Sequence, residues 1–337
     1  MVKGGKSLNT VPKIALVGCG YWGKNLCRNF HALGALAAVV DATEKGQVTA
    51  RSIAPNAFIT DSLDDILNDD QIEGIALATP AETHAELAIK VMRSSKDVFV
   101  EKPMALSISD AEAMQAVSNK TNRILMVGHL LEYHPAVLKL RELIDSGELG
   151  KINYIYSNRL NFGKIRTEEN VLWSFAPHDV AVILRLLGQS PLEVSVSGGA
   201  YLTHDVADVT VSNLRFLSDS RAHIFVSWLH PYKEQRLVVV GDKKMAIFND
   251  VNPFGEKLHI FPQSVEFDGR IPVLNKEDAE FIDHANTEPL REECAHFLDC
   301  IRTRKTPLTD AQSGIEVLKI LHACQASIDQ NGMPISI

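Results

Sequence analysis

The sequence predicts an α/β fold with a doubly wound parallel sheet first and an α+β domain with an open-faced, mainly antiparallel sheet second. From Lys13 to Gly128, short apolar runs alternate with helical patterns, which is typical of parallel strands joined by crossover helices. Later stretches alternate apolar and polar residues, which is typical of antiparallel strands with one open face. The length of 337 residues exceeds what one core usually organises, so two domains are expected.

Each element follows from these patterns in order. Met1–Val11 is predicted to be a flexible leader, 12–128 the first domain and 129–337 the second. The first domain is expected to hold strands at 14–17, 37–40, 57–60, 74–78, 97–100 and 124–128, and helical segments at 44–53, 61–67, 82–93 and 107–118. A further helix is expected directly after residue 23. The second domain is expected to hold helices at 135–146, 177–187, 288–304 and 310–330, and strands at 151–160, 193–202, 207–217, 221–229 and 235–240.

A glycine-rich turn between the first strand and its helix is the most informative motif. Ile14–Val17 is followed by Gly18, Cys19, Gly20, Tyr21, Trp22 and Gly23, and the second strand ends at Asp41. Gly18 permits a tight turn, Gly20 lets backbone approach a pyrophosphate, and Gly23 lets helix and strand pack closely. A carboxylate at position 41 would accept hydrogen bonds from the adenine ribose and repel a 2′-phosphate. The pattern predicts a Rossmann domain that binds NAD rather than NADP, with Tyr21 and Trp22 also at the cofactor. The competing interpretation is a simple glycine turn beside an ordinary acidic strand end.

Polar residues follow two other predicted strands, at the edge where such folds bind ligands. Thr79, Pro80 and His84 come after one strand, and Glu101 and Lys102 after the next, and all five are expected at the cofactor. A cation at Lys102 could stabilise an alkoxide-like substrate oxygen as hydride leaves. Taken alone, Lys102 could equally be a solvated lysine.

His178 is the second candidate catalytic residue. Pro177 suits the first turn of a helix, so His178 is expected near a helix N-terminus. There the helix dipole would lower the pKa of the imidazole and favour the neutral base. The alternative is that His178 and Asp179 are capping or ion-pairing groups.

Composition limits the class of partner. A net charge of −8 argues against nucleic acid or an anionic membrane surface. No apolar stretch is long enough to span a bilayer, and no apolar signal region is visible. The five cysteines have no metal-binding spacing, so a cytoplasmic protein with reduced thiols and no metal is expected.

Taken together, Gly-Cys-Gly-Tyr-Trp-Gly at 18–23, Thr79-Pro80 with His84, Glu101-Lys102-Pro103 and the later histidine resemble the Gfo/Idh/MocA family of NAD(P)-dependent sugar oxidoreductases. The resemblance covers nearly the whole chain. It implies that Lys102 and His178 match the family's catalytic lysine and histidine. Many members carry an aspartate four residues before that histidine, where this chain has Ser174. This leaves open whether a Lys-Asp-His proton relay operates or His178 works with Lys102 alone.

Finer features resemble a branch of nucleotide-sugar 3-dehydrogenases, which oxidise the C3 hydroxyl of UDP-N-acetylglucosamine or its uronate. They are the segments 128–135, 170–173 and 289–298. This resemblance implies substrate contacts from Tyr133, Arg159, Arg166, Trp173 and His178. Arg159, Lys164 and Arg166 could supply charge for a diphosphate, or form a solvated basic loop. A dehydrogenase of a free sugar, inositol or another activated sugar remains the alternative, and a noncatalytic dinucleotide sensor is a third.

The second domain also predicts self-association. Apolar residues such as Phe225, Trp228 and Val238 are expected on an outer sheet face that no predicted helix covers. A homodimer or homotetramer is therefore expected.

Overall fold

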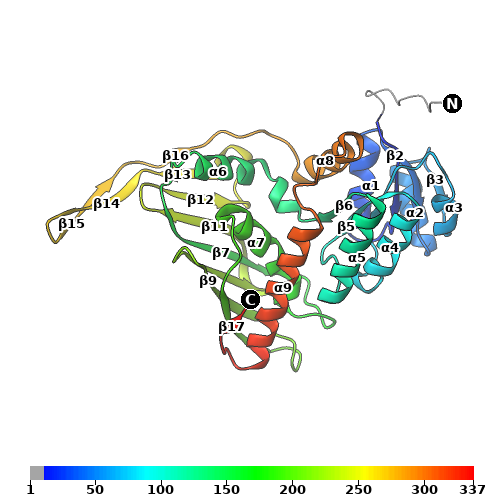
Figure 1. Ribbon diagram of the computed structural model, residues 1–337. Helices are drawn as coiled ribbons and strands as arrows, with labels where there is room; N and C mark the ends of the chain where they lie inside the picture. Colours follow the sequence, from blue (N-terminus) through cyan, green and yellow to red (C-terminus); the bar gives the residue numbers. More distant parts are fainter. Residues whose placement is uncertain (1–10) are drawn as a thin grey trace. The chain divides into compact units, whose positions relative to one another are not determined.

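The computed structural model describes residues 11–337, so the predicted leader lies, apart from Val11, outside the described residues. The chain forms two compact units (Figure 1). The first is the described part of Met1–Leu130 together with Glu288–Leu318, and the second is Leu131–Thr287 with Lys319–Ile337.

The first unit contains a six-stranded sheet in which every neighbouring pair is parallel. The strand order is β3-β2-β1-β4-β5-β6, the doubly wound arrangement that the sequence predicts. The two central strands are fully buried because helices cover both faces. The strands are β1 (Ile14–Val17), β2 (Leu36–Val40), β3 (Phe58–Thr60), β4 (Gly74–Leu77), β5 (Asp97–Glu101) and β6 (Leu125–Gly128).

Crossover helices join these strands. Two of them begin at side-chain caps: Thr43 accepts the N–H of Gly46, and Ser107 accepts the N–H of Asp110. The helices are α1 (Gly23–Ala32), α2 (Glu44–Ile53), α3 (Leu63–Leu67), α4 (His84–Arg93) and α5 (Ile108–Thr121), with a 3-10 turn η1 (Ala81–Thr83) before α4.

The first unit also takes in helix α8 (Pro289–Thr303), which the sequence analysis assigned to the second domain. Phe297 of α8 packs edge-on against Phe30 and Phe99, with ring centroids 6.4 and 5.9 Å apart. Gly74 leaves the room for this helix, since a Cβ there would lie 2.7 Å from Ile301. The return of α8 therefore rests on apolar contacts between residues far apart in sequence. Helix α9 (Ala311–Asp329) spans the division between the units at residue 318.

The second unit is built on a nine-stranded sheet of order β16-β13-β12-β11-β7-β10-β9-β8-β17. All neighbouring pairs are antiparallel except β10 with β7, so the predicted mainly antiparallel sheet is confirmed. The strands are β7 (Ile152–Phe162), β8 (Glu193–Gly199), β9 (Val209–Arg215), β10 (Arg221–Ser227), β11 (Leu229–Gly241), β12 (Met245–Asn249), β13 (Leu258–Phe261), β16 (Glu280–Phe281) and β17 (Ile335–Ser336).

Helices cover one face of this sheet. Helix α7 (Val171–Leu187) packs on β7, β9 and β10, and α6 (Pro135–Asp145) packs on α7 and β12. On β10 the buried residues are Ala222, Ile224 and Val226, while the intervening Arg221, His223 and Phe225 are exposed or half-buried. The sheet is thus open-faced at this strand.

Two of the expected outer-face residues are instead buried. Trp228 is fully buried and its indole N–H donates to Asp208, because it follows the end of β10, where strand alternation no longer sets its direction. Val238 is buried together with Leu237 and Val239, since both faces of β11 are covered there.

A two-stranded hairpin, β14 (Gln263–Asp268) and β15 (Ile271–Lys276), projects from the nine-stranded sheet (Figure 1). It was not predicted from the sequence. Its apolar residues are open to solvent: Phe267 is 69% exposed and Ile271 67%.

Candidate active site

The glycine loop after β1 has the backbone that a dinucleotide requires. Gly18 has φ +90°, and a Cβ there would lie 2.7 Å from the carbonyl oxygen of Ala78. A Cβ at Gly23 would lie 2.0 Å from the carbonyl oxygen of Gly18, so this position must be glycine for helix α1 to approach. Gly20 is exposed, and a Cβ there would meet no atom within 4 Å. Gly18 and Gly23 thus serve packing, and Gly20 leaves open backbone in front of the N-terminus of α1, where a pyrophosphate fits.

Asp41 lies at the end of β2, beside this loop. Its Oδ2 accepts the N–H of Cys19 at 2.6 Å, and its Oδ1 accepts the N–H and hydroxyl of Thr43 at 2.8 and 2.7 Å. Burial by itself raises the pKa of Asp41, but these donors outweigh it and hold the pKa below its ordinary value. The carboxylate is therefore ionised at neutral pH. It accepts three hydrogen bonds of about four that its lone pairs allow, which leaves capacity for a ribose hydroxyl.

The carboxylate of Asp41 also depends on a glycine that the sequence analysis missed. A Cβ at Gly46 would lie 2.1 Å from the carboxyl carbon of Asp41. Any side chain at the start of α2 would displace this carboxylate from the loop. The only sign of this role in the sequence is that Gly46 is a glycine inside a predicted helix. The hydrophobic periodicity of the helix gives no reason for a glycine there.

The two aromatic residues of the loop have different surroundings. Tyr21 is 83% exposed, with the Lys24 ammonium 5.6 Å from its ring centroid. The indole N–H of Trp22 donates to Oε1 of Glu101 at 2.5 Å. Trp22 thereby connects the glycine loop to the end of β5, immediately before Lys102.

His84 connects the other two strand ends. The residue is 1% exposed, with Nδ1 2.8 Å from the carbonyl oxygen of Pro103 and Nε2 2.9 Å from that of Thr79. Burial lowers the pKa of His84 although both carbonyls raise it, so the ring is neutral at pH 7 and donates to one of them. His84 holds the Thr79–Pro80 turn against the turn that follows Lys102. Pro80 is exposed at the same edge of the sheet.

Lys102 is half-buried between two buried titratable groups. Burial raises the pKa of Glu101 to about 7, although Trp22 and the charge of Lys102 lower it. Glu101, the last residue of β5, pairs with Gly128, the last residue of the neighbouring strand β6. Lys102 and His129, the residues that follow these two, therefore lie at the same level of the sheet. The predicted cofactor residues of the first unit therefore gather at the carboxyl edge of the parallel sheet. A cavity of about 280 Å³ lies at the start of β6, which is the opposite edge of the parallel sheet, and none of these predicted cofactor residues lines it.

In the second unit, His178 stands well inside a helix. Helix α7 begins at Val171, where Asn170 caps it by accepting the N–H of Trp173, so the expected start at Pro177 is wrong. Proline has no N–H to donate, but its φ is helical, and the helix continues through Pro177. His178 is thus in the helix interior, where the end of the helix dipole does not act on it. Ser174, one turn earlier, is buried on the same face.

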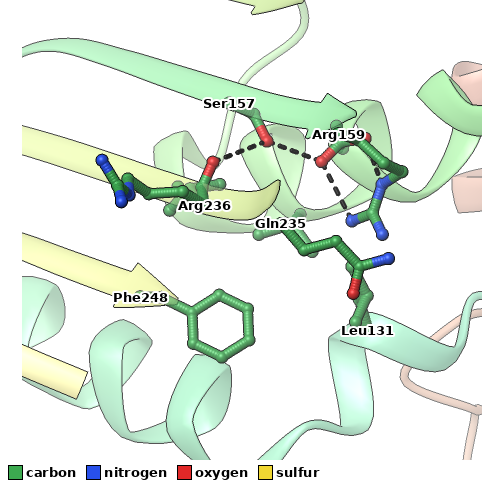
Figure 2. A pocket seen from close by; sticks show the side chains of 9 residues that line it. Leu131, Ser157, Arg159, Gln235, Arg236 and Phe248 are labelled. Carbon is green, nitrogen blue, oxygen red and sulfur yellow. Dashed lines mark hydrogen bonds and ion pairs between the residues drawn. The ribbon is translucent and has the colours of Figure 1, made fainter. Parts of the chain in front are cut away.

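Arg159, which is labelled in Figure 2, is held by the carboxylate of Asp179, the residue after His178. Its Nε and Nη2 lie 2.7 and 3.1 Å from the two carboxylate oxygens of Asp179, and the hydroxyl of Ser157 donates to Oδ1 at 2.6 Å. Burial by itself lowers the pKa of Arg159, but the Asp179 charge outweighs it and raises the pKa. The predicted substrate arginine is therefore half-buried in an ion pair between β7 and α7, in which the Asp179 carboxylate is buried. The ion-pair alternative considered for Asp179 describes this contact.

The cavity beside this pair is small. Its volume of about 10 Å³ is room for one water-sized molecule, far less than a sugar needs. Its walls come from the start of the second unit, α7 and the strands β7, β11 and β12: Leu131, Ser157, Arg159, Asp179, Val182, Gln235, Arg236, Leu237 and Phe248.

The other predicted substrate residues lie around α7 or near its start. Tyr133 is buried in the 3-10 turn η2 (Leu130–Tyr133), which Glu132 ties to α7 by accepting Arg185 Nε at 2.7 Å. The indole N–H of Trp173 donates to Gln325 at 3.1 Å. Arg166 lies in the loop before α7, where its Nη1 is 3.0 Å from Glu169.

Neither a metal site nor a membrane-spanning helix is found in the described part of the chain. No group of three His, Cys, Asp or Glu side chains between residues 11 and 337 is arranged to hold a metal ion. None of the helices in that range is both long and apolar enough to cross a bilayer.

Comparison with known proteins identifies the family of this chain. The model of the Gfo/Idh/MocA oxidoreductase family with an NAD-binding Rossmann fold matches residues 12–129, and that of the family's C-terminal domain matches 137–247. UDP-N-acetylglucosamine 3-dehydrogenase of Acidithiobacillus ferrooxidans is 25% identical over 91% of this chain and 94% of that protein. The scyllo-inositol 2-dehydrogenase (NAD(+)) of Bacillus subtilis is 27% identical over 96% of each.

A solved structure of the Acidithiobacillus ferrooxidans enzyme has the same fold, with a TM-score of 0.84 and 23% identity over 95% of this chain and 98% of that one. The two family models together match more than half of the chain. The glycine loop, Asp41 and the strand ends fit the dinucleotide that the first model specifies. This protein belongs to the Gfo/Idh/MocA family of oxidoreductases and uses NAD.

Proposed function

We propose that this protein is an NAD-dependent dehydrogenase that oxidises the C3 hydroxyl of a nucleotide sugar, UDP-N-acetylglucosamine or its uronate. The observation that carries the dehydrogenase activity is Lys102, a cation held at the carboxyl edge of the parallel sheet between Glu101 and His129. The choice of substrate is supported by the Acidithiobacillus ferrooxidans relative, which matches 91% of this chain.

The proposed chemistry divides among the residues as follows. NAD, when bound, accepts the hydride from the substrate carbon. Gly20 and the N-terminus of α1 would hold its pyrophosphate, and Asp41 its adenine ribose. Lys102 stabilises the negative charge that develops on the substrate oxygen. A cation fixed in a partly buried site stabilises such a charge more than water does. His178 holds the substrate hydroxyl and takes its proton.

A free sugar or inositol is the second candidate substrate, and one observation favours it. Arg159 and Arg166 both pair with carboxylates of this chain, so the predicted basic cluster offers less charge to a diphosphate than the sequence suggested. The Bacillus subtilis relative, which acts on scyllo-inositol, matches 96% of the chain.

A substrate screen separates these candidates. The protein is incubated with NAD and either UDP-N-acetylglucosamine, its uronate, N-acetylglucosamine, glucose or scyllo-inositol, while absorbance of the reduced cofactor is followed. The proposal expects turnover with the UDP-sugars and much less with the free sugars. Faster turnover of a free sugar or inositol would favour the second candidate. Binding of NAD without turnover of any substrate would favour a noncatalytic sensor.

A further inference from the structure

His129 is a buried histidine whose ring has no hydrogen-bond partner among residues 11–337. Its residue is 2% exposed, and neither Nδ1 nor Nε2 is bonded. His84, which is equally buried in the same unit, lies within 2.9 Å of a carbonyl oxygen at both ring nitrogens. Buried polar side chains almost always have a partner, because desolvation without a hydrogen bond is costly. The orphaned ring of His129 therefore points to a partner that binds from outside the chain.

The position of His129 indicates which partner. It directly follows β6, and the pairing of Glu101 with Gly128 puts it level with Lys102 on the adjacent strand. In a doubly wound sheet of this order, each half binds one mononucleotide. Asp41 marks the half β1–β3 as the adenosine side, so β4–β6, with Lys102 and His129, is the nicotinamide side.

The chemistry of the ring also matches. Burial, helped by the nearby charge of Lys102, lowers the pKa of His129 to about 4. At neutral pH the imidazole is therefore uncharged, with one N–H donor and one lone-pair acceptor. A carboxamide group offers the complementary pair, a carbonyl oxygen and an NH₂ group.

We propose that His129 binds the carboxamide of the nicotinamide ring of NAD and so fixes that ring beside Lys102. This contact rests on NAD binding by the first unit, whichever sugar is the substrate. The proposal adds His129 to the cofactor site, beside the residues of the glycine loop and Lys102.

Binding measurements on the apo protein test the contact without turnover. Affinities for NADH and for ADP-ribose, which lacks nicotinamide, are measured by titration calorimetry for the wild type, His129→Leu and His129→Gln. We expect His129→Leu to weaken NADH binding by about fivefold to thirtyfold, the loss of a hydrogen bond that leaves its partner unpaired. ADP-ribose affinity should not change. His129→Gln, which keeps a donor and an acceptor, should restore part of the NADH affinity.

Thermal unfolding of the same apo variants provides the matched control. Because the ring of His129 makes no hydrogen bond within residues 11–337, His129→Leu should leave the apo melting temperature unchanged or raise it. His296→Leu removes a bond that the structure does contain, from the N–H of Leu308 at 2.9 Å, and should lower it. In His296→Leu, the affinities for NADH and for ADP-ribose should change by the same factor, if they change at all.

Each other outcome contradicts the proposal. Equal losses of NADH and ADP-ribose affinity in His129→Leu, or a fall in its apo melting temperature, would show that the residue supports the fold. Unchanged NADH affinity with a raised KM for the sugar would assign His129 to the substrate. If the wild type bound neither NADH nor ADP-ribose, NAD binding itself would fail, whereas a failed sugar screen leaves this contact intact.

Discussion

Asp41 is expected to combine two roles in one carboxylate, since it holds the glycine loop through Cys19 and ends the strand beside which we expect the adenine ribose. Asp41→Asn keeps an oxygen for the loop but removes the charge. We expect the preference for NAD over NADP to narrow by about tenfold or more, since a hydrogen bond to a charged group contributes about 1.5–3 kcal/mol. Titration calorimetry with both cofactors measures this ratio. A wild type that binds NADP as tightly as NAD would refute the assignment.

Lys102 and His178 are expected to act on the same substrate hydroxyl. Lys102→Met and His178→Ala should each lower turnover by about 10²–10⁴-fold, the usual contribution of a positioned acid–base group. Their double variant should lose less than the product of the single losses, because groups that act together are not additive. Calorimetry should show that both variants still bind NAD, because neither residue touches the pyrophosphate loop. If the acidic limb of the pH–rate profile is unchanged in His178→Ala, His178 is not the base.

Glu101 makes stability depend on pH near neutrality. Its pKa rises from an ordinary 4.5 to about 7 on folding, so between these values the folded chain holds a proton that the unfolded chain releases. The free energy of unfolding must then fall as pH rises through this range, by about 3 kcal/mol when complete. Glu101→Gln keeps an acceptor for Trp22 and should remove this fall. Urea unfolding at pH 5 and pH 8 measures the free energy of unfolding of the wild type and of Glu101→Gln. If this free energy changes with pH equally in both proteins, the raised pKa of Glu101 is contradicted.

At the scale of elements, the Arg159–Asp179 pair joins β7 to α7 next to His178. Breaking a buried ion pair by removing one partner costs about 3–5 kcal/mol, because the other charge stays buried. Arg159→Met should therefore destabilise the protein by that amount in urea, and Arg159→Met with Asp179→Leu should recover much of the loss. If Arg159→Met raises only the KM of the substrate and leaves stability unchanged, Arg159 contacts the sugar instead.

At the scale of the whole molecule, the open sheet face and the β14–β15 hairpin predict self-association. An isolated two-stranded hairpin is marginally stable, and Phe267 and Ile271 are more than half exposed on it. We expect a homodimer or homotetramer by light scattering at micromolar concentration. Phe267→Ser with Ile271→Ser tests the hairpin, and Val48→Ser, on the exposed face of α2, is the matched control. A monomeric wild type would refute the prediction.

The sequence by itself determined the parallel sheet, its glycine loop and the strand ends that carry Lys102. Those features depend on contacts close in sequence, where a tight turn requires Gly18 and a short apolar run forms β1. Most predicted strands and helices of the first unit agree with the structure within a few residues because their periodicity is local.

Only the tertiary structure decided which distant residues meet. The return of α8 depends on the packing of Phe297 against Phe30 and Phe99, and the pairing of Arg159 depends on how α7 lies on β7. The burial of His129 and the start of α7 before Pro177 also follow from packing that no sequence window contains. Local patterns specify which elements form, whereas side-chain partners depend on long-range packing, so the site's backbone was predictable and its hydrogen bonds were not.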